Sequence, residues 1–173
     1  NPHLCENIVI GTAPYAFKGF VGYRNFEMRT REGEVLSYAN SIWSLMDLEK
    51  MTPVGPSERM LTGYVLEEKY PMEYAPRKIH VPADGEGVES FLVKEHHLDT
   101  NNHVNNGQYV RMAMEYLPKE FLVRQLRVEY KSQAILGDRI HPAVAVDREK
   151  SLYTISLNRE DGRPYSIVEL SGV

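Results

Sequence analysis

The sequence predicts an α+β fold in which an antiparallel sheet and one main helix bury each other. Residues 110–117 are mostly apolar, which is typical of a buried helix, and Pro118 is expected to end that helix. Further along, stretches of strand character are joined by turns too short for parallel crossovers, so these strands must be mainly antiparallel. The order of strands and glycine turns also recurs, which indicates two copies of one unit.

The first part of the chain is expected to form a hairpin. Residues 7–10 are interpreted as the end of a strand that runs into a turn at Gly11. Aromatic and branched side chains are dense in residues 17–30, and the side chains of residues 35–46 alternate as they do in strands. A charged turn around Gly33 separates these two stretches, so we predict a long antiparallel hairpin.

The middle of the chain differs in composition, because proline and glycine interrupt residues 48–87 repeatedly. We predict a linker there, with one short helix capped by Ser57. The expected divisions are an incomplete first half at residues 1–47, a linker at residues 48–88 and a second domain at residues 89–173. Within the second domain, strands are expected over residues 89–94, 121–130, 140–146, 153–158 and 165–170.

The internal repeat predicts that the first copy is incomplete. The turns at Gly11 and Gly33 lie 22 residues apart, and those at Gly137 and Gly162 lie 25 residues apart. The second copy carries a strand and a helix before Gly137, whereas too few residues precede Gly11 for both. A sheet without its helix leaves an apolar face bare. We therefore expect either a fragment of a longer protein or self-association, for example as a homodimer.

Composition restricts the functional classes. The chain has 173 residues, a net charge of −4 and a pI near 5.9, so nothing favours binding to nucleic acid or to an anionic membrane. No apolar run approaches the length of a membrane helix, and the first residues do not resemble a signal peptide. The single cysteine, Cys5, excludes an internal disulfide framework. These features predict a cytoplasmic protein.

A polar motif directly precedes the predicted helix. Asp99, Asn101 and His103 follow one another at two-residue spacing, and Asn105 and Asn106 come next. Any one of these residues is typical of a helix cap, but a helix start can use only a few side-chain acceptors. The excess predicts a site in which a carboxylate, amides and an imidazole meet the free N–H groups of a helix start.

The motif also carries a family resemblance. The string Asp99-x-Asn101-x-His103-Val-Asn-Asn-x-x-Tyr109, followed by Glu115 and Pro118, resembles the second-half signature of acyl-acyl carrier protein (acyl-ACP) thioesterases. The segments Gly-Thr-Ala-Pro-Tyr from residue 11 and Gly-Tyr-Arg-Asn-Phe from residue 22 are similar to the first lobe of that family. The resemblance implies a tandem hotdog fold, each sheet wrapped around a central helix, with the N-terminal strand and helix of the first hotdog missing.

The resemblance further implies hydrolysis of fatty acyl-ACP to free fatty acid and ACP, without a cofactor. It puts Asp99, Asn101 and His103 in the catalytic set, and leaves open whether Asp99 or His103 accepts the proton of water. Asn101 is expected to hold the water or to fix the imidazole. The N–H groups at the helix start are expected to bind the carbonyl oxygen of the thioester, and they belong to Val104, Asn105, Asn106 and Gly107.

The sequence departs from the pattern of the plant enzymes after the helix. The plant pattern has a catalytic Glu and a Cys where this chain has Gln133 and Ala134. A cysteine nucleophile at this place is therefore excluded. Gln133 is retained as a candidate catalytic residue, because its amide can orient water although it cannot accept a proton.

Alternative functions stay open from the sequence. A hotdog hydrolase of acyl-coenzyme A differs only in its carrier, and a non-catalytic acyl-binding module would also fit the change at Gln133. A hotdog dehydratase is disfavoured by the asparagine-rich helix start. His96, His97 and His103 match no common zinc spacing, so no metal is expected. The expected partner is ACP, through its phosphopantetheine-linked acyl chain. Four basic residues could form a patch that binds this region of ACP, or equally a solvated strand face: Arg124, Arg127, Lys131 and Arg139.

Overall fold

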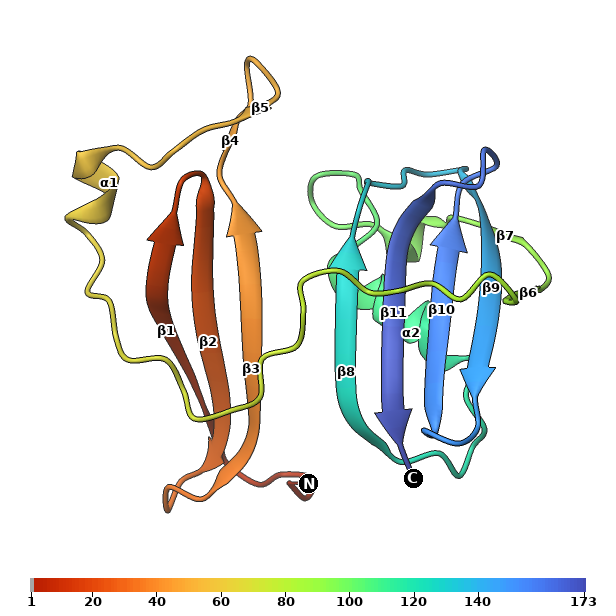
Figure 1. Cartoon of the computed structure of the whole chain (residues 1–173), viewed down its shortest axis with the longest axis horizontal. Helices are drawn as coiled ribbons and strands as arrows, with labels where there is room; N and C mark the ends of the chain where they lie inside the picture. The colour runs from red at the N-terminus through yellow and green to blue at the C-terminus, as the bar shows by residue number, and fades with distance from the viewer. Residues whose placement is uncertain (1) are drawn as a thin grey trace. The chain divides into compact units, whose positions relative to one another are not determined.

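The computed structural model describes residues 2–173, and the chain divides into two compact units, the first ending at Ala75 and the second beginning at Pro76. Each unit contains its own antiparallel sheet (Figure 1). The predicted α+β class and the tandem hotdog architecture are confirmed, whereas the divisions at residues 47 and 88 stay predictions. None of the helices in the described chain is both long and apolar enough to traverse a bilayer.

The first unit is built on a three-stranded antiparallel sheet in the order β1-β2-β3. Its strands are β1 (Ile8–Lys18), β2 (Val21–Thr30) and β3 (Val35–Ser44). The predicted hairpin around Gly33 is confirmed, and Gly33 has a positive φ of 97°. The predicted turn at Gly11 is wrong, because Gly11 lies inside β1 opposite Glu27. The first turn lies instead at Gly19, which has a φ of 60°.

The role of Gly11 is close packing within the sheet. A Cβ atom at this position would lie 2.9 Å from Cγ of Glu27, so a larger residue would displace that side chain. The spacing from Gly11 to Gly33 therefore does not measure a turn-to-turn interval. The repeat of two sheets is present, but it does not rest on this pair of glycines.

Residues 46–75 return along the first unit. This segment contains β4 (Met46–Asp47), β5 (Thr52–Pro53) and the one-turn helix α1 (Glu58–Leu61). Ser57 caps α1 as predicted, because its side chain accepts a hydrogen bond from Met60 N at 3.3 Å. Residues 64–74, which we call the strap, then cross one face of the sheet and bond to it at Pro14 and Asn25.

Asn25 is the polar anchor of the strap. It is completely buried, and its Oδ1 accepts hydrogen bonds from Tyr70 N at 3.1 Å and from the Tyr74 hydroxyl at 2.9 Å. Asn25 pairs with Ala13 and Asn40 on the neighbouring strands, so these residues share the face that the strap covers. Burial of an amide is tolerated because both ends of the side chain have partners.

Asn25→Ala is expected to lower the free energy of unfolding of the first unit by about 1–3 kcal/mol, because it leaves buried donors of the strap without an acceptor. Trp43, the single tryptophan, lies on β3 and reports this transition by fluorescence during urea denaturation. Tyr74→Phe, which removes one of the two donors, is the matched variant and is expected to cost less. Equal midpoints for Asn25→Ala and the unaltered protein would contradict the anchor role.

The opposite face of the first sheet carries exposed apolar side chains. Ile10 pairs with Met28 there, and Ile10 and Trp43 are 61% and 58% exposed. Within residues 2–75 no central helix covers this face, as expected for an incomplete first hotdog. The short α1 reaches one end only, where Met60 and Trp43 line a pocket of about 310 Å³.

The second unit has a larger antiparallel sheet in the order β6-β9-β10-β11-β8, with β7 paired to β9. The four strands predicted after the helix are confirmed, whereas the strand expected over residues 89–94 is reduced to the two residues of β7. The strands are β6 (Glu86–Gly87), β7 (Phe91–Leu92), β8 (Val123–Tyr130), β9 (Arg139–Asp147), β10 (Leu152–Asn158) and β11 (Pro164–Gly172).

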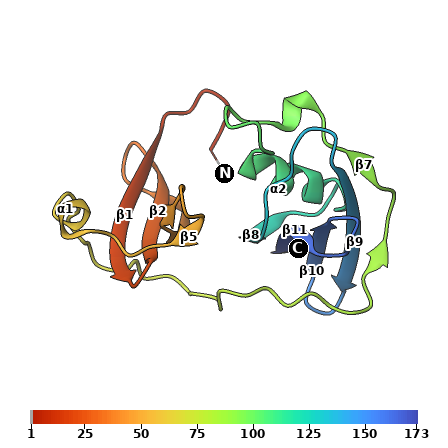
Figure 2. The ribbon, with the colours of Figure 1, turned by 90° about the horizontal axis from the view of Figure 1, so that it is seen from above.

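Helix α2 (Asn106–Met114) packs on one face of this sheet, and residues that lead from the strap cross the other face (Figure 2). Tyr109, Met112 and Ala113 are the buried residues of α2, a spacing that places them on one side of the helix. They pack against a core that includes Leu157 and Val168, both without exposed surface. The helix thus covers a face of the second sheet, whereas within residues 2–75 no central helix covers the corresponding face of the first sheet.

The predicted helix is buried on the face that packs against the sheet, whereas Met114 is 45% exposed. Its predicted end at Pro118 is wrong, because the helix ends at Met114 with Glu115 as its C-cap. Proline disfavours helical geometry in the residue before it, and Leu117 already lies in a turn closed by its N–H to Met114 O at 3.2 Å.

Candidate functional site

Asp99 lies in a tight turn that follows the 3₁₀ helix η1 (Glu95–His97). The turn is closed by Asp99 N, which donates to His103 O at 2.8 Å. Asp99 Oδ1 accepts hydrogen bonds from Asn101 N at 2.8 Å and from His103 N at 3.4 Å. One carboxylate oxygen therefore holds the turn together. The other, Oδ2, has no hydrogen-bond partner among the described residues, and neither does the imidazole of His103.

The start of α2 uses most of its N–H groups internally. Asn105 is the N-cap, and its Oδ1 accepts from Gly107 N at 2.9 Å. Val104 N donates to Ala134 O, and Asn105 N donates to His97 O, both at 2.9 Å. These three N–H groups are predicted oxyanion donors, and the bonds they already make leave them unavailable to a ligand in this structure. Asn106 N is the one of the four predicted donors without a partner in the described chain.

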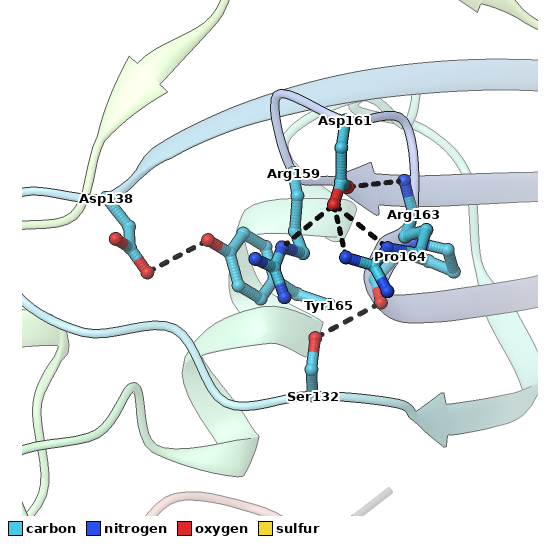
Figure 3. Close-up of polar contacts among 7 residues, drawn as sticks. All are labelled: Ser132, Asp138, Arg159, Asp161, Arg163, Pro164 and Tyr165. Carbon is cyan, nitrogen blue, oxygen red and sulfur yellow. Dashed lines mark hydrogen bonds and ion pairs between the residues drawn. The ribbon is translucent and has the colours of Figure 1, made fainter.

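Gln133 lies in a short segment, residues 131–135, that follows β8 and is fixed from two sides. The N–H groups of Lys131 and Ser132 donate to Tyr165 O at 2.8 and 3.2 Å. Figure 3 shows two further hydrogen bonds in this region: Ser132 Oγ donates to Pro164 O at 3.4 Å, and the Tyr165 hydroxyl donates to Asp138 Oδ2 at 2.9 Å. The segment is therefore tied to the start of β11.

Tyr165 stays protonated throughout the physiological range. Burial of its ring, followed by the hydrogen bond to Asp138, raises the pKa of the Tyr165 phenol to about 12. The same carboxylate oxygen accepts the N–H of Ile135 at 3.0 Å. Asp138 thus joins the phenol to the far end of the Gln133 segment, and this connection persists at neutral pH.

The turn at Asp99, the start of α2 and the segment that carries Gln133 all line one pocket of about 360 Å³ in the second unit. Asp99, His103 and Gln133 line it together with the helix start, so the sequence-predicted residues are brought together. Asn101 and Gly107 are the exceptions, because neither lines the pocket: Asn101 contacts Asp99 through its backbone N–H, and Gly107 N donates to the side chain of Asn105. The complete lining is Asp99, His103, Val104, Asn105, Asn106, Tyr109, Tyr130, Lys131, Ser132 and Gln133.

Two tyrosines and Ser132 line this pocket although the sequence did not single them out as site residues. Tyr130 ends a predicted strand, and its alternation with Val128 places it on the side that faces α2. That alternation was the available signal. Burial raises the pKa of the Tyr130 and Tyr109 phenols, so both lie in the pocket as hydroxyl groups.

Two of the four residues that would comprise a basic patch or a solvated strand face are neutralised by carboxylates. Arg127 pairs with Glu169 and also donates to Pro76 O and Lys78 O. Lys131 pairs with Glu129. Although burial works to raise it, the pKa of Glu129 is lowered by the hydrogen bonds from Lys131 and Ile79 N, so the Glu129 carboxylate is charged at neutral pH.

Two of the histidines near the motif, His96 and His97, lie in η1 and do not line the pocket. Their ring centroids are 4.2 Å apart. Among residues 2–173, no group of His, Cys, Asp and Glu side chains is arranged to hold a metal ion. His97 instead supports the turn, because its Nδ1 accepts Lys94 N at 3.0 Å.

His97 is expected to make stability depend on pH. Burial, followed by the charges of His96 and Lys94, lowers its pKa below the ordinary value of 6.5. Since the unfolded chain then takes up the proton first, the contribution of His97 is complete above pH 6.5 and is lost as pH falls through the lowered pKa. Protonation also removes the acceptor of Lys94 N. Urea unfolding of His97→Gln should therefore show a weaker pH dependence than the unaltered protein.

His80→Gln is the control for this measurement, because His80 is exposed and makes no hydrogen bond in the described chain. Its unfolding is expected to follow the unaltered protein at every pH. Parallel curves for His97→Gln and the unaltered protein would exclude the contribution of His97.

Comparison with known proteins places this geometry in a family. The family model described as the acyl-ACP thioesterase C-terminal domain matches residues 82–168, and the model for the N-terminal domain matches residues 1–63. Acyl-[acyl-carrier-protein] hydrolase FATB1, chloroplastic, of Cuphea viscosissima is 27% identical over 144 residues, which cover 75% of this chain and 34% of that protein. The chain thus spans about a third of the length of the curated relatives it matches.

Solved structures agree in fold. An acyl-ACP thioesterase from Bacteroides thetaiotaomicron superposes with a TM-score of 0.84 at 20% identity, over 96% of this chain and 68% of that one. The 12:0-ACP thioesterase from Umbellularia californica gives 0.81 at 15% identity, over 98% and 69% of the two chains. Both domain models of one family match in the expected order along this sequence. The chain therefore belongs to the acyl-ACP thioesterase family.

Proposed function

We propose that the protein hydrolyses fatty acyl-ACP to free fatty acid and ACP. The observation that carries this proposal is the pocket in which Asp99, His103 and Gln133 meet the unpartnered N–H of Asn106. Proton acceptors, a water-binding amide and an oxyanion donor are the groups that hydrolysis of a thioester requires. The expected partner is the phosphopantetheine arm of ACP, and a cytoplasmic location and a homodimer stay predictions.

In the proposed mechanism, the carbonyl oxygen of the thioester accepts a hydrogen bond from Asn106 N at the positive end of α2. One such donor is typically worth about 10²–10³ in rate. Either Asp99 Oδ2 or the His103 imidazole takes a proton from water as its oxygen attacks the carbonyl carbon. The C–S bond then breaks, and the thiolate leaves with that proton as a thiol.

The remaining residues orient these groups. The carboxamide of Gln133 holds the attacking water but accepts no proton. Asn101 acts through its backbone N–H on Asp99 Oδ1, which leaves Oδ2 as the oxygen that can face the pocket. Val104, Asn105 and Gly107 shape the helix start through the bonds described above rather than by binding the oxyanion.

Kinetics on matched substrates test the proposal. Hydrolysis should be measured on acyl-ACP and acyl-coenzyme A with the same acyl chain, over chains of graded length. A higher kcat/KM on acyl-ACP supports the proposed carrier, whereas equal values favour a coenzyme A hydrolase. Binding of acyl-ACP without turnover at any chain length would refute the enzymatic proposal and identify an acyl-binding module.

The acyl-binding alternative rests on the short first half and on Gln133, which stands where the plant pattern has a carboxylate. Gln133→Glu is expected to shift the acidic limb of the pH–rate profile upward, because a second carboxylate in the pocket of Asp99 raises the pKa of one of them. Gln133→Asn is the neutral control and leaves the position of that limb unchanged. An unshifted profile for Gln133→Glu would place Gln133 outside the reacting groups.

A further inference from the structure

We propose that Tyr109 is a positioning residue of this site, and that its hydroxyl fixes the segment carrying Gln133 against the start of α2. The inference rests on the proposed thioesterase function for its catalytic consequence. Its structural part, a hydrogen bond between helix and segment, is independent of any activity.

Both backbone groups of Ala134 are bound to the motif region. Ala134 N donates to the Tyr109 hydroxyl at 2.9 Å, and Ala134 O accepts Val104 N at 2.9 Å. Ala134 directly follows Gln133 and has no exposed surface, so water cannot replace either partner. These two bonds set the distance between the Gln133 backbone and the first turn of α2.

Tyr109 is placed for this role by the geometry of the helix. It lies in the first turn of α2, three residues after Asn106, and is 2% exposed. Its ring packs 6.1 Å from the ring of Tyr130, whose hydroxyl donates to Asn106 O at 3.1 Å. Asn106, which has the free N–H, and the segment that carries the Gln133 carboxamide are thus connected through the Tyr130 and Tyr109 phenols.

Removal of the Tyr109 hydroxyl should therefore move the site without emptying the core. Phenylalanine keeps the buried ring, but it leaves the Ala134 N–H buried without an acceptor. The segment can restore this bond only by shifting, and Gln133 would move with it. A displacement of about 1 Å in a positioned group is enough to cost about 10² in rate.

The matched control is Tyr116→Phe. Tyr116 follows α2, packs against the same core, and its hydroxyl makes no hydrogen bond in the described chain. Both variants lose one buried or half-buried hydroxyl, and only Tyr109→Phe removes the partner of Ala134. A merely structural contribution of a tyrosine hydroxyl would appear in both variants.

The experiment measures kinetics on acyl-ACP and, by NMR, hydrogen exchange of the Ala134 amide and the side-chain amide resonance of Gln133. For Tyr109→Phe we expect kcat to fall about 10- to 100-fold with KM within about twofold. The Ala134 amide should exchange at least about tenfold faster, and the Gln133 resonance should shift. Tyr116→Phe should match the unaltered protein in all three measurements.

The outcomes separate this inference from the proposed function. If the unaltered protein and Asp99→Ala are equally inactive, the proposed function fails, while the exchange of Ala134 and the Gln133 resonance still decide the positioning role. Unchanged exchange and resonance in Tyr109→Phe would overturn it. An unchanged kcat in an active enzyme, despite faster exchange, would also overturn it, since the bond would then hold the segment without serving the reaction.

Discussion

Asp99→Ala and His103→Ala are each expected to lower kcat for acyl-ACP hydrolysis by about 10²–10⁴, as observed when positioned acid–base groups are removed. Asp99 Oδ2 and the His103 imidazole lack partners in the described chain and line one pocket, so both are available to the attacking water. The double variant should be little slower than the worse single variant, because residues that act as a unit are not additive.

The controls distinguish chemistry from folding. Asp99 also closes its own turn through Oδ1, so Asp99→Asn, which keeps an acceptor there, should retain the fold and still lose activity. Asn101→Ala should cost less, since its backbone N–H remains. Circular dichroism and urea midpoints check that the variants are folded. Activity equal to that of the unaltered protein in the double variant would place the site elsewhere and leave the asparagine-rich motif as a helix cap.

Leu157→Ala is expected to lower the free energy of unfolding of the second unit by about 2–5 kcal/mol. Leu157 has no exposed surface and belongs to the core between α2 and the sheet, so truncation removes apolar contacts and leaves a cavity. Urea denaturation followed by circular dichroism measures the loss.

Leu136→Ala provides the comparison for this core variant. Leu136 lies in the turn before β9 and is 52% exposed, so its truncation should change stability by less than about 0.5 kcal/mol. Equal effects of the two substitutions would show that the core described between α2 and the sheet does not govern the stability of this unit.

Much of the fold follows from local patterns in the sequence. Stretches of strand character predicted β8 to β11, and charged turns at Gly137 and Gly162 predicted two of their three connections. Gly11 was misassigned because glycine indicates a turn only when the backbone needs a positive φ. In β1, Gly11 instead leaves room for the side chain of Glu27, which packs close to its Cα. This close packing comes from a neighbouring strand and leaves no trace in the surrounding residues.

The candidate site could be predicted only in part, for a similar reason. Asp99 and His103 are close in sequence, so their common place at a helix start could be predicted. The fate of the N–H groups could not, because Val104 N is taken by Ala134, which follows a strand some distance along the chain. Tyr109 was recognised only as part of a motif, since its partner is equally remote.

The order of strands in the second sheet has a kinetic consequence. β9, β10 and β11 are joined by short turns and pair with their neighbours in sequence, whereas β8 pairs with β11 and so closes a long loop. Contacts between remote residues form later in folding because loop closure costs entropy before they can form. The segment after β8 carries Gln133 and binds Tyr165 at the start of β11. We therefore expect the pocket to form after β9, β10 and β11 have paired, so that a chain in which β8 has not yet joined β11 would have most of its sheet but not the candidate site.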